Sequence, residues 1–161
     1  MRKWLISVFV LSCLFMGMTE KIPVSISAEQ PTTKKLAVSS DRIYVLQVET
    51  RRVTIFDANQ KEIKRFEIAT PYSRALPRPV DIAFDQDLGI LYVLDAEFNE
   101  IWCYDQNGEF THRLPMVLQY LQSPSSILAL QSKLLIADIG CLWVADELGH
   151  LINRVKIPIG P

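Results

Sequence analysis

The chain has 161 residues and a mass of 18.4 kDa, a size that suits one domain. Hydrophobic residues make up 49% and charged residues 22%, a balance that excludes general disorder. The formal net charge is −1 with the two signs interspersed, which excludes the basic surface that nucleic-acid binding needs. Three cysteines are too few for a disulfide scaffold.

The N-terminal segment indicates export. Arg2 and Lys3 precede an apolar run over residues 4–18, the pattern of a secretory signal. We expect residues 1–28 to be removed as a signal peptide. Two alternatives stay open: the segment is an uncleaved membrane anchor, or Cys13 carries a lipid. In each case the mature part is expected to be extracytoplasmic, either secreted or periplasmic, or to be anchored to the outer face of the membrane.

A polar linker at residues 29–35 leads into three copies of one unit. In each copy an Asp is followed eight residues later by an Arg, and the copies start 48 and then 41 residues apart. These pairs are Asp57 and Arg65, Asp105 and Arg113, and Asp146 and Arg154. Every unit has four short runs rich in Val, Ile, Tyr, Phe and Trp, separated by Asp, Asn and Gly, which predicts strands. The units cover residues 36–70, 79–115 and 124–157.

The runs differ in the burial that they predict. The second and third runs are apolar on both faces, as in residues 91–94 and 101–104, and must be covered on both sides. The fourth run mixes charges with apolar residues, as at 61–68, which is typical of an outer strand with one wet edge. Sheets of four antiparallel strands with this burial, repeated at this period, predict the blades of a β-propeller. A simple sandwich would not explain the repeat.

The turns between the third and fourth runs differ in sequence. Asn107 and Gly108 predict a tight primed turn, because both positions of such a turn need positive φ. Leu148 and Gly149 meet the requirement less well. The turn at residues 59–60 lacks a glycine and is expected to be the loosest.

The middle copy resembles the NHL repeat. Its sequence from Pro79 is P-V-D-I-A-F-D-Q-D-L-G-I-L-Y-V-L-D-A-E-F-N-E-I-W-C-Y-D-Q-N-G-E-F. The first copy departs from the family pattern at Gln47, where the family has Asp, and the third shortens the loop after Asp138. The resemblance covers roughly residues 33–157. It implies a propeller, usually of six blades, that binds proteins, RNA or ligands, although some relatives are calcium- or zinc-dependent lactonases and lyases.

Three blades make half of such a ring. The outer faces of the first and third blades would be left in water, and their apolar area would exceed what a monomer usually exposes. We therefore expect self-association or a protein partner to complete the ring, with a truncated gene product as the alternative.

The sequence predicts no catalytic, metal or cofactor site. The innermost strand should be the first run, where Asp81 and Asp85 have no acidic counterparts in the other copies, so we expect them to cap turns or line a wet channel. His112 and His150 fall on outer strands and read as surface histidines, because a zinc site needs three or four convergent ligands.

The remaining regular residues also have a structural interpretation. Cys103 should be a small core residue and Cys141 partly exposed, without a bond between them, although an exported protein allows one. The Asp and Arg of each turn either pair across the hairpin, or the Asp binds turn amides while the Arg is solvated.

Loops are where a propeller binds its partners. The predicted ligand or partner face combines the loops after the second runs with the links between blades, and consists of Tyr72, Arg74, Arg78, Glu97, Phe98, Asn99 and Tyr120. The alternative is that its aromatic residues fill gaps between blades. The sequence favours an exported binding module without catalysis of its own, acting on a protein or another ligand. The alternatives are a fragment or subunit of a metal-dependent hydrolase or lyase, or a truncated product without activity.

Overall fold

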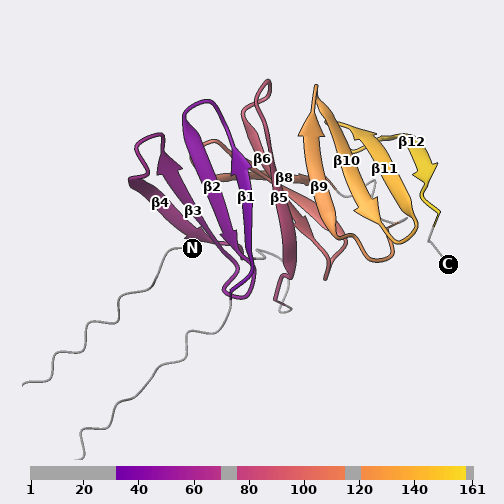
Figure 1. The fold of residues 1–161 in the computed structure, drawn as a ribbon, viewed down its shortest axis with the longest axis horizontal. Coiled ribbons are helices and arrows are strands. Elements are labelled where there is room, and N and C mark those ends of the chain that lie inside the picture. Colours follow the sequence, from indigo (N-terminus) through magenta and orange to yellow (C-terminus); the bar gives the residue numbers. More distant parts are fainter. Residues whose placement is uncertain (1–31, 70–75, 115–120, 159–161) are drawn as a thin grey trace, which may run out of the picture. The chain divides into compact units, whose positions relative to one another are not determined.

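The computed structural model describes residues 32–69, 76–114 and 121–158. These ranges form three antiparallel sheets of four strands, and strands that follow one another along the chain are neighbours in each sheet (Figure 1). Within these ranges, the prediction of an all-β fold with three repeated units is confirmed. The predicted leader at residues 1–28 lies outside the described residues. No helix in the described ranges is long and apolar enough to cross a membrane.

Each strand follows one of the predicted runs. The first sheet contains β1 (Lys34–Val38), β2 (Arg42–Gln47), β3 (Arg52–Asp57) and β4 (Glu62–Glu67). The second contains β5 (Pro79–Asp85), β6 (Ile90–Asp95), β7 (Glu100–Asp105) and β8 (Phe110–Leu114). The third contains β9 (Ser126–Leu130), β10 (Lys133–Asp138), β11 (Cys141–Asp146) and β12 (Leu151–Lys156).

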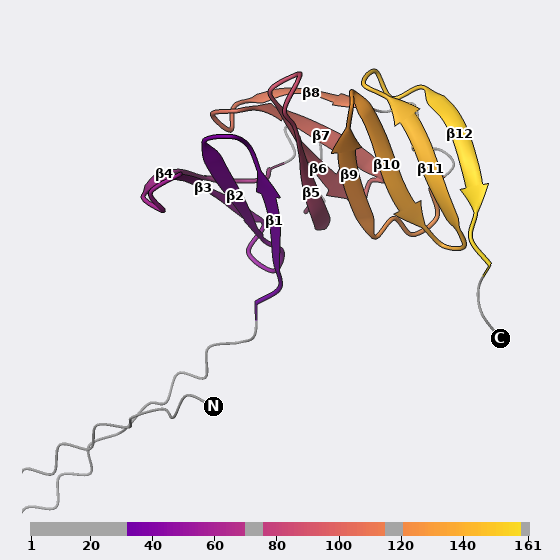
Figure 2. The same ribbon diagram turned by 45° about the horizontal axis from the view of Figure 1, so that its top comes forward.

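The first strand of each sheet is the inner one. β5 contacts both β1 and β9, so that the three inner strands lie side by side (Figures 1 and 2). The fourth strands are the most exposed to solvent. Every residue of β12 is exposed, and only Leu114 of β8 is buried. This arrangement confirms the predicted order from inner to outer strand.

The three turns before the fourth strands share one geometry, which differs from the predicted primed turn. In the middle sheet, the Gly108 amide donates to the Asp105 carbonyl at 3.0 Å, and the Asp105 carboxylate accepts from the amides of Asn107 and Glu109. Only Gly108 has positive φ, at 76°. Since neither central residue has positive φ, the turn is of type I, and its left-handed fourth residue leads into a β-bulge.

The turn without glycine is not looser than the others. Gln60 adopts φ of 65°, and the Asp57 carboxylate accepts from the amides of Asn59 and Lys61, both at 2.9 Å. The carboxylate accepts the same two hydrogen bonds as in the other turns. The turn geometry is therefore retained, with Gln60 in a strained left-handed conformation.

The repeated Asp and Arg residues do not pair with each other. Arg65 donates to Glu62 at 2.7 Å, and Arg113 donates to Glu100 at 2.8 Å. The guanidinium of Arg154 lies over the ring of Trp143, 4.7 Å from its centroid. The Asp residues bind turn amides instead, as the second of the two interpretations predicted, but its expectation that the Arg side chains are simply solvated was wrong.

The first joint, between the first and second sheets, is a packed apolar layer. Tyr44, Leu46, Val53 and Ile55 meet residues of the middle sheet that include Val93 and Trp102, all nearly or fully buried. Phe84 and Tyr44 stack with ring centroids 5.0 Å apart.

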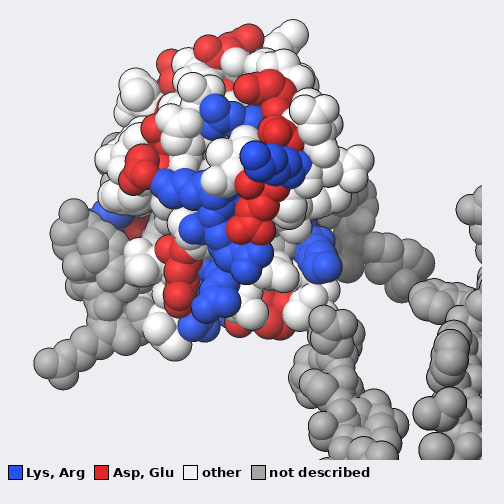
Figure 3. Space-filling view, turned by 90° about the vertical axis from the view of Figure 1, so that its left-hand side faces the viewer, with Lys and Arg blue, Asp and Glu red and all other residues white. Residues whose placement is uncertain are grey.

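Polar contacts surround this joint. Arg42 donates to Asn107 Oδ1 at 2.9 Å, and Lys64 pairs with Glu109. Basic residues outnumber acidic ones in the first sheet, and the reverse holds in the second. Figure 3 views the side of the molecule that carries the first sheet, where Lys and Arg side chains form a band with Asp and Glu beside it. At the joint itself, the Lys64–Glu109 pair adds an opposite-charge contact to the apolar packing.

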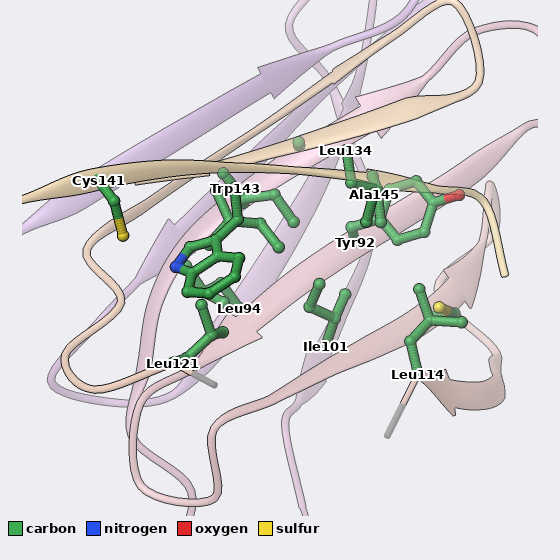
Figure 4. Packing of buried hydrophobic residues seen from close by; sticks show 13 residues of the cluster. Tyr92, Leu94, Ile101, Leu114, Leu121, Leu134, Cys141, Trp143 and Ala145 are labelled. Atoms are coloured by element: carbon green, nitrogen blue, oxygen red, sulfur yellow. The ribbon is translucent and has the colours of Figure 1, made fainter. Parts of the chain in front are cut away.

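The second joint, between the second and third sheets, is also a packed apolar layer. Tyr92, Leu94 and Ile101 of the middle sheet pack against Ile136 and Trp143 of the third (Figure 4). The middle sheet is thus covered on both faces, which is why its second and third strands lack the alternation of a half-exposed strand.

Candidate functional site

The inner strands line a groove of about 370 Å³. Its walls are residues 36–38 of β1, 81–84 of β5 and 127–129 of β9, so that every sheet contributes one strand. Asp81 is the one ionisable residue among them. The side chains of this lining are apolar apart from the carboxylate of Asp81, which is already bonded to β9.

Asp81 links the inner strands. Its Oδ2 accepts hydrogen bonds from Ser126 Oγ at 2.6 Å and from the Ile127 amide at 2.9 Å. Its Oδ1 lies 4.0 Å from Lys35 Nζ. Lys35, Asp81 and Ser126 occupy one register position in their sheets, opposite Leu46, Leu94 and Ala137 respectively. Lys35, Asp81 and Ser126 thus form a chain of polar contacts along the inner strands.

Asp85 caps the turn after β5. Its Oδ1 accepts from the amides of Asp87 at 2.9 Å and Leu88 at 3.0 Å, while its Oδ2 is buried without a partner in the described part of the chain. The prediction that Asp85 caps a turn is confirmed.

Asp95 repeats this arrangement at the other end of the middle sheet. It is fully buried, and its Oδ1 accepts from the amides of Glu97 and Phe98, both at 2.9 Å. Burial raises the pKa of Asp95, although these amides oppose the shift. The sequence marked Asp95 as part of the repeat, but it carried no signal that the carboxylate would be fully enclosed.

The structure brings together the described members of the predicted recognition face. Arg78 precedes β5 and residues 96–99 follow β6, and because these strands are antiparallel both segments lie at the same end of the sheet. The Ala96 amide donates to the Arg78 carbonyl at 3.0 Å, and Arg78 Nη2 donates to the Ala96 carbonyl at 3.1 Å. Tyr72, Arg74 and Tyr120 lie outside the described residues.

The side chains of this face differ in exposure. Arg78 and Glu97 are exposed, while Phe98 and Asn99 are half-buried. The ring of Phe98 stacks on Trp102 with centroids 6.4 Å apart and packs against the core of the first joint. Phe98 therefore fills a gap between sheets, as the alternative interpretation expected, and among the described members of the face the exposed residues are Arg78 and Glu97.

A second hollow, which the sequence did not indicate, lies beside the third sheet. It has a volume of about 300 Å³, and Asp138, Trp143 and Arg154 are among its lining residues. Asp138 accepts from the amides of Gln122 and Ser123 and from the Trp143 indole. Burial alone would raise the pKa of Asp138, but these donors outweigh it and hold the pKa below its usual range.

The remaining titratable candidates do not converge. His112 and His150 are exposed, as expected for surface histidines, and His150 Nδ1 lies 3.0 Å from the Asp146 carboxylate. Cys103 and Cys141 are free and buried. The prediction of a partly exposed Cys141 was wrong, because its side chain points into the second joint. Among the described residues no group of three or more His, Cys, Asp or Glu could hold a metal ion.

Comparison with known proteins identifies the fold and no closer relationship. No protein-family model matches the chain, and no curated protein matches it. Glutaminyl cyclase of Myxococcus xanthus superposes with a TM-score of 0.63 at 9% identity, over 80% of this chain and 55% of that chain. A streptogramin B lyase gives 0.57 at 16% identity, over 77% and 40%. A chain of the nidogen/laminin complex gives 0.55 at 16% identity, over 73% and 43%.

These structural neighbours are β-propeller proteins. Identities this low show the fold alone. The chain spans between about two fifths and just over half of the length of these three proteins. The three sheets are accordingly blades of a propeller, with a polar contact chain along their inner strands and a loop face around Arg78 at one end.

Proposed function

We propose that this chain is an exported propeller module of the NHL type that works by binding a protein or another ligand. The observation that carries the proposal is the loop face, where hydrogen bonds between Arg78 and Ala96 hold a link between blades against the loop that presents Glu97. Loops fixed on a rigid sheet are the usual recognition elements of such scaffolds. Export is inferred from Arg2, Lys3 and the apolar run that follows them.

Site-specific photo-crosslinking in the producing cells tests this face. A photoreactive residue replaces Glu97 in one variant and Asp87 in the other. The two positions are both acidic and exposed, but they lie at opposite ends of β6. We expect a discrete adduct from position 97 only, and a lower yield when Arg78→Glu is added. Equal adducts from both positions, or none from position 97, would refute the proposed face.

The export proposal has a separate readout. N-terminal sequencing of the protein from cells should begin near Glu29, or at a lipidated Cys13. An intact Met1 in the membrane fraction would indicate an anchor. An intact Met1 in the soluble cytoplasmic fraction would contradict export.

A second candidate function is a metal-dependent hydrolase or lyase. Its support is the carboxylate of Asp81 in the groove along the inner strands, together with the enzymes among the structural neighbours. Elemental analysis of purified protein after supply of calcium and zinc distinguishes the two. Stoichiometric metal that is lost in Asp81→Asn would favour the enzyme. The absence of bound metal would count against the enzyme and favour the binding module.

A further inference from the structure

One face of the first sheet is exposed to solvent, although the equivalent positions of the other two sheets are buried. Leu36, Ile82 and Ile127 occupy the same register position, opposite Val45, Val93 and Ile136 respectively. Ile82 and Ile127 are 3% and 5% exposed, because each faces the sheet that precedes it, whereas Leu36 is 63% exposed. This first end face includes Leu36, Val38, Val45 and Phe56 at positions that a preceding sheet would cover, with Lys34 and Arg65 beside them.

The third sheet has the opposite face open. Ala37, Ala83 and Leu128 share a register position, and the two alanines are 6% and 5% exposed because each faces the sheet that follows it. Leu128 is 55% exposed. Likewise Leu114 is 3% exposed, while Val155 at the equivalent position is 46% exposed. This second end face, which includes Leu128, Leu135, Leu142 and Val155, is shaped to receive a following sheet.

We propose that a second copy of this chain covers both end faces, with the third sheet of each copy packed on the first sheet of the other. Such a pair would use the same two kinds of face that form the first and second joints, and would close a ring of six sheets by two-fold symmetry. The chain spans only 55%, 43% and 40% of the propeller chains that it resembles, so two copies approach the material of one of them. This inference does not depend on the loop face.

The polar contacts of the first joint specify which residues would meet. Lys64 on β4 pairs there with Glu109, which follows the left-handed turn residue of the next sheet. Asn153 stands where Lys64 does, since Lys64 is opposite Ile55 and Asn153 is opposite Val144. Lys61 stands where Glu109 does, after Gln60. In the proposed ring, Asn153 therefore faces Lys61 of the partner subunit.

A second contact follows from the same equivalence. Arg42 donates to Asn107 across the first joint. Lys133 has the register position of Arg42, each opposite the Asp of its turn, and Asn59 has the position of Asn107. Lys133 can thus donate to Asn59 of the partner subunit.

The joint between copies would not be a full copy of the internal ones. Thr54 stands where Trp102 and Trp143 stand in the other sheets, opposite Val45, Val93 and Ile136 respectively. A hollow of about 390 Å³ lies over this position. Because less apolar area is buried there, we expect a dimer that dissociates on dilution rather than a permanent one.

Sedimentation velocity of the purified chain over a wide dilution series tests the proposal. The expected result is a reversible equilibrium between monomer and dimer. Leu128→Glu and Leu36→Glu should each give a monomer that remains folded, since both side chains are exposed in one copy. Leu88→Glu, a substitution of another exposed leucine in the turn after β5, is the matched control and should leave the dimer intact.

A charge cycle tests the predicted contact itself. Asn153→Glu should tighten the dimer about two- to fivefold by pairing with Lys61, and adding Lys61→Glu should reverse the gain and weaken the dimer. Asn153→Lys should weaken it, and Lys61→Glu should restore it in that background. Net charge alone cannot produce this alternation of sign. A monomer at all concentrations, open-ended larger species, or a dimer that is insensitive to both the leucine and the charge variants would overturn the proposal.

Discussion

The carboxylate of Asp81 bonds to two groups of the neighbouring sheet at once, accepting from the hydroxyl of Ser126 at 2.6 Å and from the amide of Ile127 at 2.9 Å. Ser126 and Ile127 follow Asp81 by 45 and 46 positions in the chain. Asp81 is only 8% exposed, so water cannot easily replace it as the acceptor. The bond therefore fixes the inner edge of the second joint, where apolar packing alone would allow the sheets to slide.

Replacing Asp81 by Ala should lower the free energy of unfolding by about 1–3 kcal/mol, because the buried amide of Ile127 loses its acceptor. Ser126→Ala should cost less, since Asp81 keeps its bond to that amide. Asp41→Ala is the control, because Asp41 accepts a bond from Ser39 in an exposed turn, and should change stability by less than about 0.5 kcal/mol. Urea unfolding measures all three. Equal effects at positions 81 and 41 would contradict the role of the buried bond.

Gln60→Gly should stabilise the protein by about 0.5–1 kcal/mol, because the left-handed conformation strains a residue with a side chain and suits glycine. The turn bonds from Asp57 would be unchanged. Thermal unfolding should show a higher midpoint for the variant. A lower midpoint would mean that the freedom glycine gains in the unfolded chain outweighs the strain.

The reverse change at Gly108 provides the comparison. A Cβ there would lie 2.5 Å from Phe66 Cε1 of the first sheet, in addition to the backbone strain. Gly108→Ala should therefore destabilise by more than Gln60→Gly stabilises. Both substitutions exchange glycine and a residue with a side chain in the left-handed conformation. Of the two positions, only Gly108 lies against a neighbouring sheet.

The repeat made the strands predictable, whereas single turns were not. A run that is apolar on both faces, such as residues 91–94, leaves no arrangement except a covered strand, and three copies of each run reinforce the interpretation. The geometry of a turn depends on one or two residues. Gln131 and Ser132 adopt φ of 50° and 56° between β9 and β10, a primed turn in residues that do not favour one. There the pairing of the strands overrides local preference.

The candidate site was predictable only in part. Arg78 and Glu97 could be placed at one end of the sheet because antiparallel strands return the chain to the same edge. The bond between Asp81 and Ser126 could not be predicted, because register equivalence places two residues on neighbouring strands without deciding whether their side chains meet. The burial of Cys141 depended in the same way on which face of β11 turns toward the second sheet.

Neither described cysteine should react with a thiol reagent in the folded protein. Burial raises the pKa of Cys103 to about 12, and Cys141 is 1% exposed. Reactive thiolate is therefore scarce at Cys103, and access is closed at Cys141. Mass-resolved labelling with and without urea measures this, and we expect both sites to be labelled only after unfolding. Rapid labelling of Cys141 in buffer would indicate that the second joint opens.

Asp95 and Asp138 should affect the pH dependence of stability in opposite directions. Burial raises the pKa of Asp95 above its ordinary 3.8, so the folded state holds this proton more tightly than the unfolded chain does. Its ionisation lowers the free energy of unfolding as the pH rises from 3.8 through the folded value. For Asp138, burial is outweighed by its hydrogen-bond donors and the pKa is lowered. Its contribution is present above the ordinary pKa and is lost as the pH falls through the lowered value.

The prediction compares Asp95→Asn with Asp138→Asn by urea unfolding, as the pH falls from neutral to about 3. Relative to Asp95→Asn, the unmodified protein should gain stability on acidification, because its buried carboxylate becomes protonated and stops opposing the fold. Relative to Asp138→Asn, it should lose its advantage over the lower part of this range, because the acceptor of the Gln122, Ser123 and Trp143 bonds becomes neutral. Each variant serves as the control for the other, since both remove one carboxylate. If the two difference curves had the same slope, the local environments would not determine the effect and the assigned pKa directions would be wrong.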